Sequence, residues 1–284
     1  MPPRQRRVTV QVAKVLGMDE ETRAALAGVT ALCKTRKFGV AGYFMPDDGV
    51  SARLAELGIM ENVEEADCSR YHRVVIPYSG IPPRERRKQE QSGISFEDFS
   101  SPFVRRAQIT LGLLCMEGAE GLVIGRHDDP ESLALLGSCP GTKILEDTTD
   151  TARLRYAPAF GVVCQTTISP KRVNWLIQQL RLRYRDSRVT FLNTTSPSMT
   201  LREEALEKAL THCDRALIVG RAGESTCEAL VETALRCGKP AVVVARPENL
   251  FPKDFEGNPK IALTAGGFAL DETIHSVAKA LLQL

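Results

Sequence analysis

The chain has 284 residues, of which 43% are hydrophobic and 25% charged, and its 37 basic and 35 acidic residues give a net charge of +2. This composition is typical of a folded globular protein, and the nearly balanced charge gives no electrostatic basis for binding nucleic acid. No segment approaches the roughly 18 consecutive apolar residues of a membrane helix, and the N-terminal residues lack the apolar stretch of a signal peptide. We therefore expect a cytoplasmic protein.

Short apolar runs alternate with segments of helical period along the chain, which predicts an α/β fold with parallel sheets and crossover helices. The predicted strands are residues 8–12, 38–43, 73–77, 121–125, 160–165, 189–193, 216–220 and 241–245. The polar segment 82–100 predicts a helix-and-loop passage. Ser169 before Pro170, and Ser225 three residues before Glu228, predict two helix starts.

The eight cysteines form no C-x-x-C pair, and several lie in apolar surroundings. We expect most of them to be buried reduced thiols rather than zinc ligands. His127 is a histidine in a predicted loop, and the sequence does not decide whether it has a function.

Two segments follow the same pattern after a predicted strand. Gly125 and Gly220 each end an apolar run and are followed by an arginine, by acidic residues and by a helix of apolar period. Such a repeated pattern predicts successive structural units of similar design. Loops at the carboxyl ends of parallel strands line binding crevices. The residues expected to face a shared pocket are Arg126, Asp129, Glu131, Arg221, Glu224 and Ser225.

Six short segments carry a more specific signal: 79–83 (S-G-I-P-P), 98–104 (D-F-S-S-P-F-V), 129–131 (D-P-E), 165–169 (Q-T-T-I-S), 193–196 (N-T-T-S) and 263–267 (L-T-A-G-G). In the same order they resemble the motifs H-G-V-P-P, D-A-T-C-P-x-V, H-P-E, Q-T-T-x-S, N-T-I-C and V-T-A-G-A of the LytB-type 4-hydroxy-3-methylbut-2-enyl diphosphate reductases. The resemblance covers nearly the whole chain. It implies three similar α/β units with small parallel sheets, arranged with pseudo-threefold symmetry around a central pocket, at residues 1–98, 99–185 and 186–284.

The resemblance also implies a cofactor that this sequence does not match. In the family, one cysteine from each unit holds an iron–sulfur (4Fe–4S) cluster, and the corresponding residues here are Asp19, Ser101 and Ser196. Hydroxyl and carboxylate oxygens are poor replacements for thiolates at a soft iron–sulfur site. The sequence also lacks the G-x-G-x-x-G fingerprint of nicotinamide and flavin sites. We therefore expect no cluster, no other cofactor and no metal site.

The residues that correspond to the family's substrate pocket are altered in part. The family's pocket histidines fall on Ser79, on Asp129 and, with a looser alignment, on Pro46, and its S-S-N loop falls on Glu224, Ser225 and Thr226. Its proton-delivering acid is retained as Glu131. The catalytic candidates are Glu131, Thr166 and Thr167. The substrate-binding candidates are Asp19, Ser79, Ser101, Arg126, Asp129, Gln165, Ser196, Arg221, Glu224, Ser225 and Thr226.

Simpler interpretations of four of these residues remain open. Glu131 also suits the first turn of a helix through the helix dipole, and Asp129 suits an N-cap. Thr166 and Thr167 also suit a structural role at a strand end. Cys164, next to Gln165, is expected to be a buried strand thiol.

The favoured function is a non-redox enzyme, a lyase or a transferase, that acts on a small molecule by acid–base chemistry, in specialised metabolism related to isoprenoids. In one alternative the protein uses a prenyl diphosphate, with Arg126 and Arg221 in place of the lost histidines. In another it is a non-catalytic binding or partner protein. The expected partner is a small molecule, not nucleic acid or a membrane, and the sequence leaves the oligomeric state open.

Overall fold

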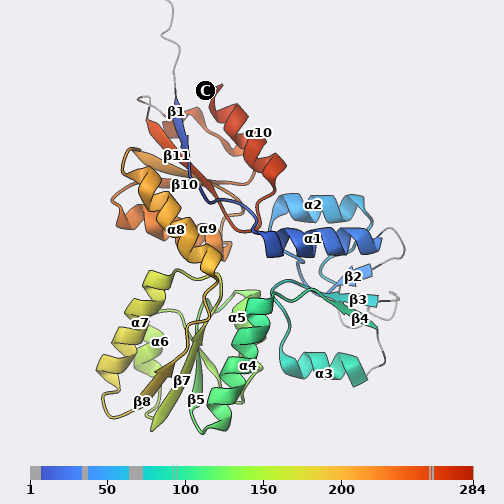
Figure 1. Ribbon diagram of the computed structural model, residues 1–284, viewed down its shortest axis with the longest axis vertical. Helices are drawn as coiled ribbons and strands as arrows, with labels where there is room; N and C mark the ends of the chain where they lie inside the picture. The colour runs from blue at the N-terminus through green and yellow to red at the C-terminus, as the bar shows by residue number, and fades with distance from the viewer. Residues whose placement is uncertain are drawn as a thin grey trace, which may run out of the picture. The chain divides into compact units, whose positions relative to one another are not determined.

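The computed structural model describes residues 8–33, 38–63, 73–91, 93, 95–255, 257 and 259–283. Strands and helices alternate along this part of the chain (Figure 1). The strands are β1 (Thr9–Val12), β2 (Phe38–Val40), β3 (Arg73–Ile76), β4 (Phe96–Asp98), β5 (Glu120–Ile124), β6 (Lys143–Leu145), β7 (Ala159–Cys164), β8 (Arg188–Phe191), β9 (Arg215–Val219), β10 (Ala241–Val244) and β11 (Lys260–Ala265). The helices are α1 (Glu20–Cys33), α2 (Asp48–Glu56), α3 (Pro83–Gln91), α4 (Pro102–Met116), α5 (Pro130–Leu136), α6 (Thr148–Arg153), α7 (Pro170–Arg183), α8 (Pro197–Leu210), α9 (Ser225–Arg236) and α10 (Asp271–Leu281), with short 3-10 helices η2 (Pro247–Asn249) and η3 (Pro252–Phe255).

Each predicted strand range contains a strand, but β4, β6 and β11 lie outside those ranges. Strand β4 lies within segment 82–100, for which only helix and loop were predicted. It has one apolar residue in three and pairs only with β3, so its sequence shows neither an apolar run nor alternation. Strand β6 is equally short. The prediction for segment 82–100 was therefore incomplete.

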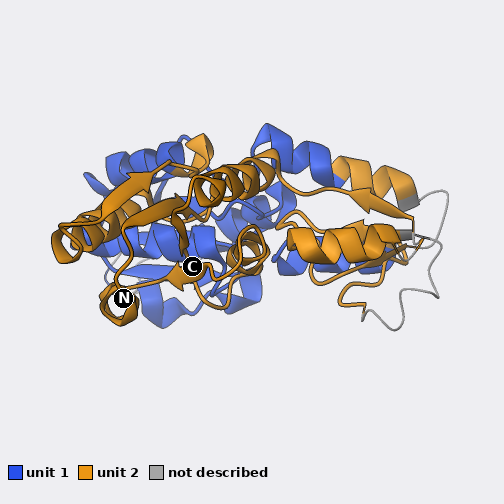
Figure 2. Ribbon diagram, turned by 90° about the horizontal axis from the view of Figure 1, so that it is seen from below, with its two compact units in different colours: residues 1–26, 45–56, 200–284 blue, residues 27–44, 57–199 orange. Residues whose placement is uncertain are grey.

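The strands form three sheets, and every strand pairing in the described part of the chain is parallel. The chain divides into two compact units (Figure 2). Unit 1, residues 1–26, 45–56 and 200–284, holds the sheet with strand order β1-β11-β9-β10. Unit 2, residues 27–44 and 57–199, holds the sheets β2-β3-β4 and β6-β5-β7-β8. The predicted α/β class with small parallel sheets is confirmed.

Two strands lie in other sheets than the predicted boundaries assign. Strand β1, in the range 1–98, pairs with β11, and β8, in the range 186–284, pairs with β7. Both are edge strands, and the order of strands along a chain does not determine which sheet edge a terminal strand joins. By their hydrogen bonding, β1 and β8 thus belong to sheets outside the units predicted at 1–98 and 186–284, respectively.

The sheet β6-β5-β7-β8 forms the middle of a three-layer arrangement within unit 2. Alternate residues of β5 explain this, because Val123 packs with apolar residues of α4 and α5, whereas Leu122 and Ile124 pack with α7. Side chains that alternate along a strand point to opposite faces, so an apolar run with no polar gaps covers both. Helix α5 lies on the α4 side and follows β5 directly, which places its N-terminus at the carboxyl edge of the sheet.

The sheet of unit 1 is covered in the same way. Apolar residues of β9 and β11, including Leu217 and Leu263, pack with Ile274 and Val277 of α10. Helix α9, which follows β9, packs on β9 and β10. The loop after β9 therefore occupies the same position in its sheet as the loop after β5.

The cysteines differ in part from the expectation. Among the described residues, the free cysteines are Cys164, Cys213 and Cys227, which are buried, and Cys237, which is exposed. Cys115 and Cys139 form a disulfide between the end of α4 and the segment after α5. The expectation of reduced thiols is thus wrong for this pair, whose 24-residue separation in the sequence gave no sign of proximity. Cys68 and the side chain of Cys33 lie outside the described residues.

No helix in the described part of the chain is long and apolar enough to cross a bilayer.

Candidate functional site

Helix α5 begins with a side-chain cap that positions Glu131. The carboxylate of Asp129 accepts a hydrogen bond from the backbone N–H of Glu131 at 2.9 Å, and Pro130 occupies the first position of the helix. Asp129 is therefore the N-cap, one of the predicted interpretations. The cap fixes the first turn of α5, and the Glu131 side chain points into the protein, where it is only 5% exposed.

The carboxyl group of Glu131 is bound by the loop between β7 and α7. It accepts hydrogen bonds from the backbone N–H of Thr166, from Thr166 Oγ1 at 3.0 Å and from Thr167 Oγ1 at 3.4 Å. Strands β5 and β7 are adjacent and parallel, so the loops after them meet at one edge of the sheet. The structure thus brings together the three predicted catalytic residues.

Burial raises the pKa of Glu131 from 4.5 to about 8, and the negative charge of Asp129 acts in the same direction. The hydrogen bonds from Thr166 and Thr167 favour the ionised form and lower the pKa, but they offset only part of the cost of burying a charge. Glu131 is therefore mostly protonated at neutral pH and close to its point of titration.

Gln165 holds the surrounding loops in place. Its Oε1 accepts hydrogen bonds from the backbone N–H of Arg126 at 3.1 Å and from Ser132 Oγ at 3.0 Å. Its Nε2 donates to Thr167 Oγ1 at 2.8 Å. Because Thr167 Oγ1 accepts this bond, its own proton is directed to Glu131 Oε2. Gln165 thus orients the hydroxyl group of Thr167.

Two residues that the sequence analysis did not select belong to this network. Ser132 is fully buried and donates to Gln165. Thr194 Oγ1 bonds to both the backbone N–H and the backbone oxygen of Cys164, at 2.9 and 2.5 Å. Ser132 could have been selected because it follows Glu131 in the motif segment, and Thr194 because it lies in segment 193–196. Cys164 is a buried thiol, as expected, and burial raises its pKa.

The arginine of this loop points elsewhere. The guanidinium group of Arg126 contacts the carboxylate of Asp128 at 3.3 Å, and its hydrogen bond lowers the pKa of Asp128. Arg126 thus donates its backbone N–H to Gln165, whereas its guanidinium group faces the carboxylate of Asp128.

Unit 1 contains a second cluster, at the start of α9. Glu224, not Ser225, is the N-cap, and its carboxylate accepts hydrogen bonds from the backbone N–H groups of Thr226 and Cys227 at 2.9 and 3.0 Å. All of these residues are buried, and burial raises the pKa of Glu224. Thr226 Oγ1 also accepts from the backbone N–H of Gly267 at 2.6 Å. The loop after β11 is thereby attached to the start of α9.

Two arginines of unit 1, Arg221 and Arg202, also have polar partners within that unit. The Nε of Arg221 is 3.9 Å from the carboxylate of Asp48. The buried Arg202 donates from its guanidinium group to the backbone oxygen of Gly17. The pocket that the sequence predicts to be shared by these residues and Glu131 stays a prediction.

Three further predicted residues, besides Asp129 and Glu224, lie directly before a helix, and two of these three act as caps. Asp19 precedes α1 and accepts hydrogen bonds from the N–H and Oγ1 of Thr22, at 2.9 and 2.7 Å. Ser101 precedes α4 and accepts from the backbone N–H of Phe103 at 3.2 Å. Ser196 precedes α8, contacts Ser198 through the hydroxyl groups, and donates its backbone N–H to Thr166 at 2.8 Å. The predicted correspondence of Asp19, Ser101 and Ser196 to one another stays a prediction.

Ser79 lies, half-buried, in the turn after β3. The backbone N–H of Ser101 donates to the carbonyl group of the adjacent Tyr78 at 2.9 Å, so the structure brings the loops of Ser79 and Ser101 together.

A family model described as LytB protein matches residues 22–282. The chain belongs to the LytB family. It is 28% identical over 256 residues to the 4-hydroxy-3-methylbut-2-enyl diphosphate reductase of Methylibium petroleiphilum, which covers 88% of this chain and 78% of that protein. It is 27% identical over 292 residues to the Treponema denticola protein of the same name, which covers 97% of this chain and all of the relative (100%).

Solved structures of such reductases share the fold. The E-1-hydroxy-2-methyl-but-2-enyl-4-diphosphate reductase of Plasmodium falciparum superimposes with a TM-score of 0.88 at 20% identity, over 96% of this chain and 87% of that chain. A second structure, an (E)-4-hydroxy-3-methyl-but-2-enyl diphosphate reductase, gives a TM-score of 0.66 at 21% identity, over 98% of this chain and 100% of that chain. The resemblance found in the sequence is therefore confirmed at the level of family and fold.

The residues that are predicted to correspond to the LytB family's cluster cysteines do not fit an iron–sulfur cluster. They present two hydroxyl groups and one carboxylate, which are hard oxygen donors, whereas such clusters take thiolates. The oxygens of Asp19 and Ser101 are also occupied as helix caps. Within the residues that the structure describes, no three His, Cys, Asp or Glu side chains are placed to hold a metal ion together.

Proposed function

We propose that this LytB-family chain is a non-redox enzyme that acts on a small molecule by acid–base chemistry, with Glu131 as the group that donates or accepts the proton. The observation that carries the proposal is the buried carboxyl group of Glu131, whose pKa is raised to about 8. A general acid or base is most effective when its pKa lies near the working pH. An ordinary surface glutamate would be fully ionised there and could not donate.

The surroundings of Glu131 suit proton donation. When the acid gives up its proton, the negative charge appears on a carboxylate that already faces the N–H of Thr166 and the hydroxyl groups of Thr166 and Thr167. These donors are fixed before the proton moves, so they stabilise the charge without reorganisation. In an elimination, Glu131 would donate its proton to the leaving oxygen as the carbon–oxygen bond breaks, and its carboxylate would take up the proton that the neighbouring carbon loses as the double bond forms. In a transfer reaction, the carboxylate would take up the proton that the attacking group loses.

The change from redox to non-redox chemistry is part of the same proposal. The names of the curated relatives describe reductases, and a reductase needs an electron carrier. Asp19, Ser101 and Ser196 do not supply the thiolates that the family's carrier requires. Proton transfer by Glu131 needs no such carrier, and it uses only residues that this chain retains.

The charges around the residues that are predicted to bind the substrate favour one that is less negative than a diphosphate. Arg126 faces Asp128, and Arg221 faces Asp48, so each guanidinium group is already close to a carboxylate. Asp129 adds a negative charge close to Glu131. A diphosphate would have to displace these pairs and bear the repulsion of Asp129. The prenyl-diphosphate alternative therefore lacks a specific observation in its favour.

The proposal is tested by comparing the wild-type protein with Glu131→Gln in an extract of small metabolites followed by mass spectrometry. Glu117→Gln, an exposed glutamate at the end of α4, is the matched control. We expect wild type and Glu117→Gln to convert the same compounds and Glu131→Gln to convert none. Conversion by Glu131→Gln at the wild-type rate would remove the catalytic assignment, and no conversion by any form would favour the non-catalytic alternative.

Calorimetric titration with isopentenyl, dimethylallyl and geranyl diphosphates, and with inorganic diphosphate, tests the alternative that the protein uses a prenyl diphosphate. We expect weak binding or none. Micromolar binding of a prenyl diphosphate that is lost in Arg126→Ala would favour the prenyl-diphosphate enzyme instead.

A further inference from the structure

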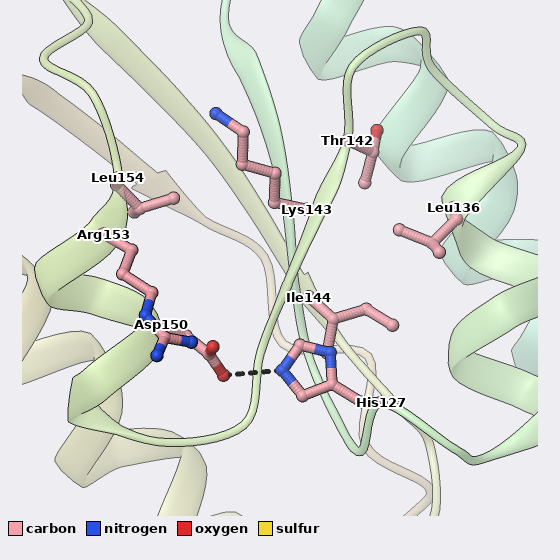
Figure 3. A pocket seen from close by; sticks show the side chains of 8 residues that line it. All are labelled: His127, Leu136, Thr142, Lys143, Ile144, Asp150, Arg153 and Leu154. Carbon is pink, nitrogen blue, oxygen red and sulfur yellow. Dashed lines mark hydrogen bonds and ion pairs between the residues drawn. The ribbon is translucent and has the colours of Figure 1, made fainter.

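A cavity of about 320 Å³ lies along the outer edge of strand β6 in unit 2 (Figure 3). Strand β6 is the edge strand of its sheet. The cavity is lined by the end of α5, by β6 itself and by α6, through His127, Leu136, Thr142, Lys143, Ile144, Asp150, Arg153 and Leu154. Glu131 is not among these residues, so the cavity is separate from the proposed catalytic site.

The floor of the cavity is apolar. Ile144 and Leu154 are 7% and 9% exposed, and Leu136 is partly buried. Arg153 and Asp150 come from α6 on one side, Leu136 and Thr142 lie on the other, and Ile144 and His127 lie between them (Figure 3). A volume of this size is at the lower end of the range for small-molecule sites, and it suits a ligand with a short aliphatic body.

The Asp150 carboxylate in the lining is already hydrogen-bonded within the protein. Asp150 Oδ2 accepts a hydrogen bond from the backbone N–H of Glu146 at 2.9 Å and lies 2.8 Å from His127 Nε2. Burial acts to raise the pKa of Asp150, but these hydrogen bonds outweigh it and hold the pKa below its ordinary value. Asp150 is thus ionised and fully engaged, and it orients the imidazole ring so that Nδ1 faces away from it (Figure 3).

Among the described residues, the two basic side chains of the lining, Arg153 and Lys143, are not held by hydrogen bonds as Asp150 is. Arg153 makes no hydrogen bond or ion pair with any residue in the described part of the chain. Lys143 Nζ has a distant ion pair, 3.9 Å from Glu120, and both side chains are about half-exposed. A lysine on an edge strand also prevents unwanted strand pairing, but that role does not explain an unpaired arginine beside an apolar hollow.

We propose that this cavity is a binding site for a small organic anion, a carboxylate or a phosphate ester with a short aliphatic chain. Arg153 binds the anionic head group through its paired N–H donors, as guanidinium groups do with carboxylate and phosphate. Lys143 adds a second positive charge at the rim. The aliphatic chain packs on Ile144 and Leu154, and His127 closes the end of the cavity.

The test uses the full chain and three probes with matched bodies: butyl phosphate, pentanoate and 1-butanol. Binding is followed by calorimetry and by chemical shifts of the lining residues. We expect one or both anions to bind with shifts at Ile144 and Leu154, and the alcohol to bind at least about tenfold more weakly, because a charge-assisted hydrogen bond contributes about this factor. Binding of butyl phosphate alone would identify a phosphate ester as the ligand, and binding of pentanoate alone would identify a carboxylate.

Three variants locate the binding. Arg153→Gln should weaken binding of the anion about tenfold or more. Arg155→Gln makes the same charge change two residues away, at an exposed position outside the lining, and should bind as the wild type does. Glu131→Gln should also bind as the wild type does, so the result does not depend on the proposed function. Equal binding of alcohol and anions, equal effects of Arg153→Gln and Arg155→Gln, or no binding of either anion would each overturn the proposal.

Discussion

Glu131 and Thr166 are 35 residues apart in the sequence, and the carboxyl group of Glu131 accepts hydrogen bonds from both the backbone N–H and the hydroxyl group of Thr166. These bonds join the start of α5 to the loop after β7. They favour the ionised carboxylate, whereas burial favours the protonated acid. Burial has the larger effect, since the pKa is raised to about 8. The balance between these two opposing effects sets the titration of Glu131 near neutral pH.

The raised pKa of Glu131 predicts a pH-dependent difference in stability between the wild type and Glu131→Gln. The unfolded chain releases this proton near pH 4.5, and the folded protein releases it near pH 8. The stabilising contribution of Glu131 is therefore fully present below the lower value and is lost as the pH rises to the higher one. Relative to Glu131→Gln, the wild type should lose on the order of 1.4 kcal/mol per pH unit within this window.

Chemical denaturation of both proteins between about pH 5 and about pH 8 measures this difference. The other titrating groups are common to the two proteins and cancel. Glu117→Gln, at an exposed position at the end of α4, is the control. A constant difference between the wild type and Glu131→Gln would show that Glu131 titrates as an ordinary glutamate.

Thr166→Val should raise the pKa of Glu131 further. The substitution removes the hydroxyl donor that lies 3.0 Å from Glu131 Oε2 and favours the ionised form. We also expect a loss of about 1 kcal/mol in the free energy of unfolding, the usual contribution of one hydrogen bond. Thr166→Ser keeps the donor and is the control. Carbon-13 NMR of the Glu131 carboxyl group measures the titration, and identical curves for the Val and Ser variants would contradict the role given to this hydroxyl group.

Gly266→Ala should destabilise unit 1. A Cβ atom at this position would lie 2.5 Å from Cys227 Sγ, 3.0 Å from Glu224 Oε2 and 3.1 Å from Thr226 Oγ1, all within a buried cluster. Crowding of a packed interior typically costs about 1–3 kcal/mol. Gly112→Ala is the matched control, since the nearest atom there is 3.7 Å away and alanine favours the helix. Thermal unfolding of both variants measures the effect, and equal melting temperatures would show that the cluster adjusts freely.

The sequence predicted most of what depends on local pattern. Apolar runs located the strands on which the site is built, and the D-P-E segment predicted that Asp129 caps the helix that carries Glu131. Hydrogen bonding between distant segments was not predictable in this way. The pairing of β1 with β11, and the ion pair of Arg221 with Asp48, join segments that no local pattern connects.

Other features escaped prediction because their residues have ordinary local surroundings. Ser132 looks like any helical serine until its contact with Gln165 is known. Cys115 lies in an apolar stretch that suits a reduced thiol, and only the packing of α4 against the segment after α5 brings it to Cys139, with 6.3 Å between the Cα atoms.

The disulfide between Cys115 and Cys139 predicts a loss of stability on reduction. A bond between residues separated by 24 positions removes loop entropy from the unfolded chain that corresponds to about 3 kcal/mol. The double variant Cys115→Ser/Cys139→Ser should show this loss without a reductant, and adding a reductant should have no further effect on it. Cys237→Ser, at an exposed free cysteine, is the control. A melting temperature of the wild type that does not change on reduction would contradict the prediction.

The donor set at Asp19, Ser101 and Ser196 predicts that the wild-type protein does not take up an iron–sulfur cluster when iron and sulfide are supplied without oxygen. The measurement is the content of bound iron and sulfide, with the visible absorption spectrum, after removal of the unbound reagents. A carboxylate and two hydroxyl groups bind soft iron–sulfur clusters poorly, and the oxygens of Asp19 and Ser101 already accept hydrogen bonds from the helices they cap.

The triple variant Asp19→Cys/Ser101→Cys/Ser196→Cys is the counterpart to this measurement. Loss of the caps at Asp19 and Ser101 should cost about 1 kcal/mol at each of these two helices, so the folding of the variant is checked first by circular dichroism. We expect the folded variant to bind more iron and sulfide than the wild type, because thiolates then stand at the three positions that precede α1, α4 and α8. Stoichiometric iron and sulfide in the wild type would show that other residues hold a cluster. The non-redox proposal would then fail, even if Glu131 still transferred the proton.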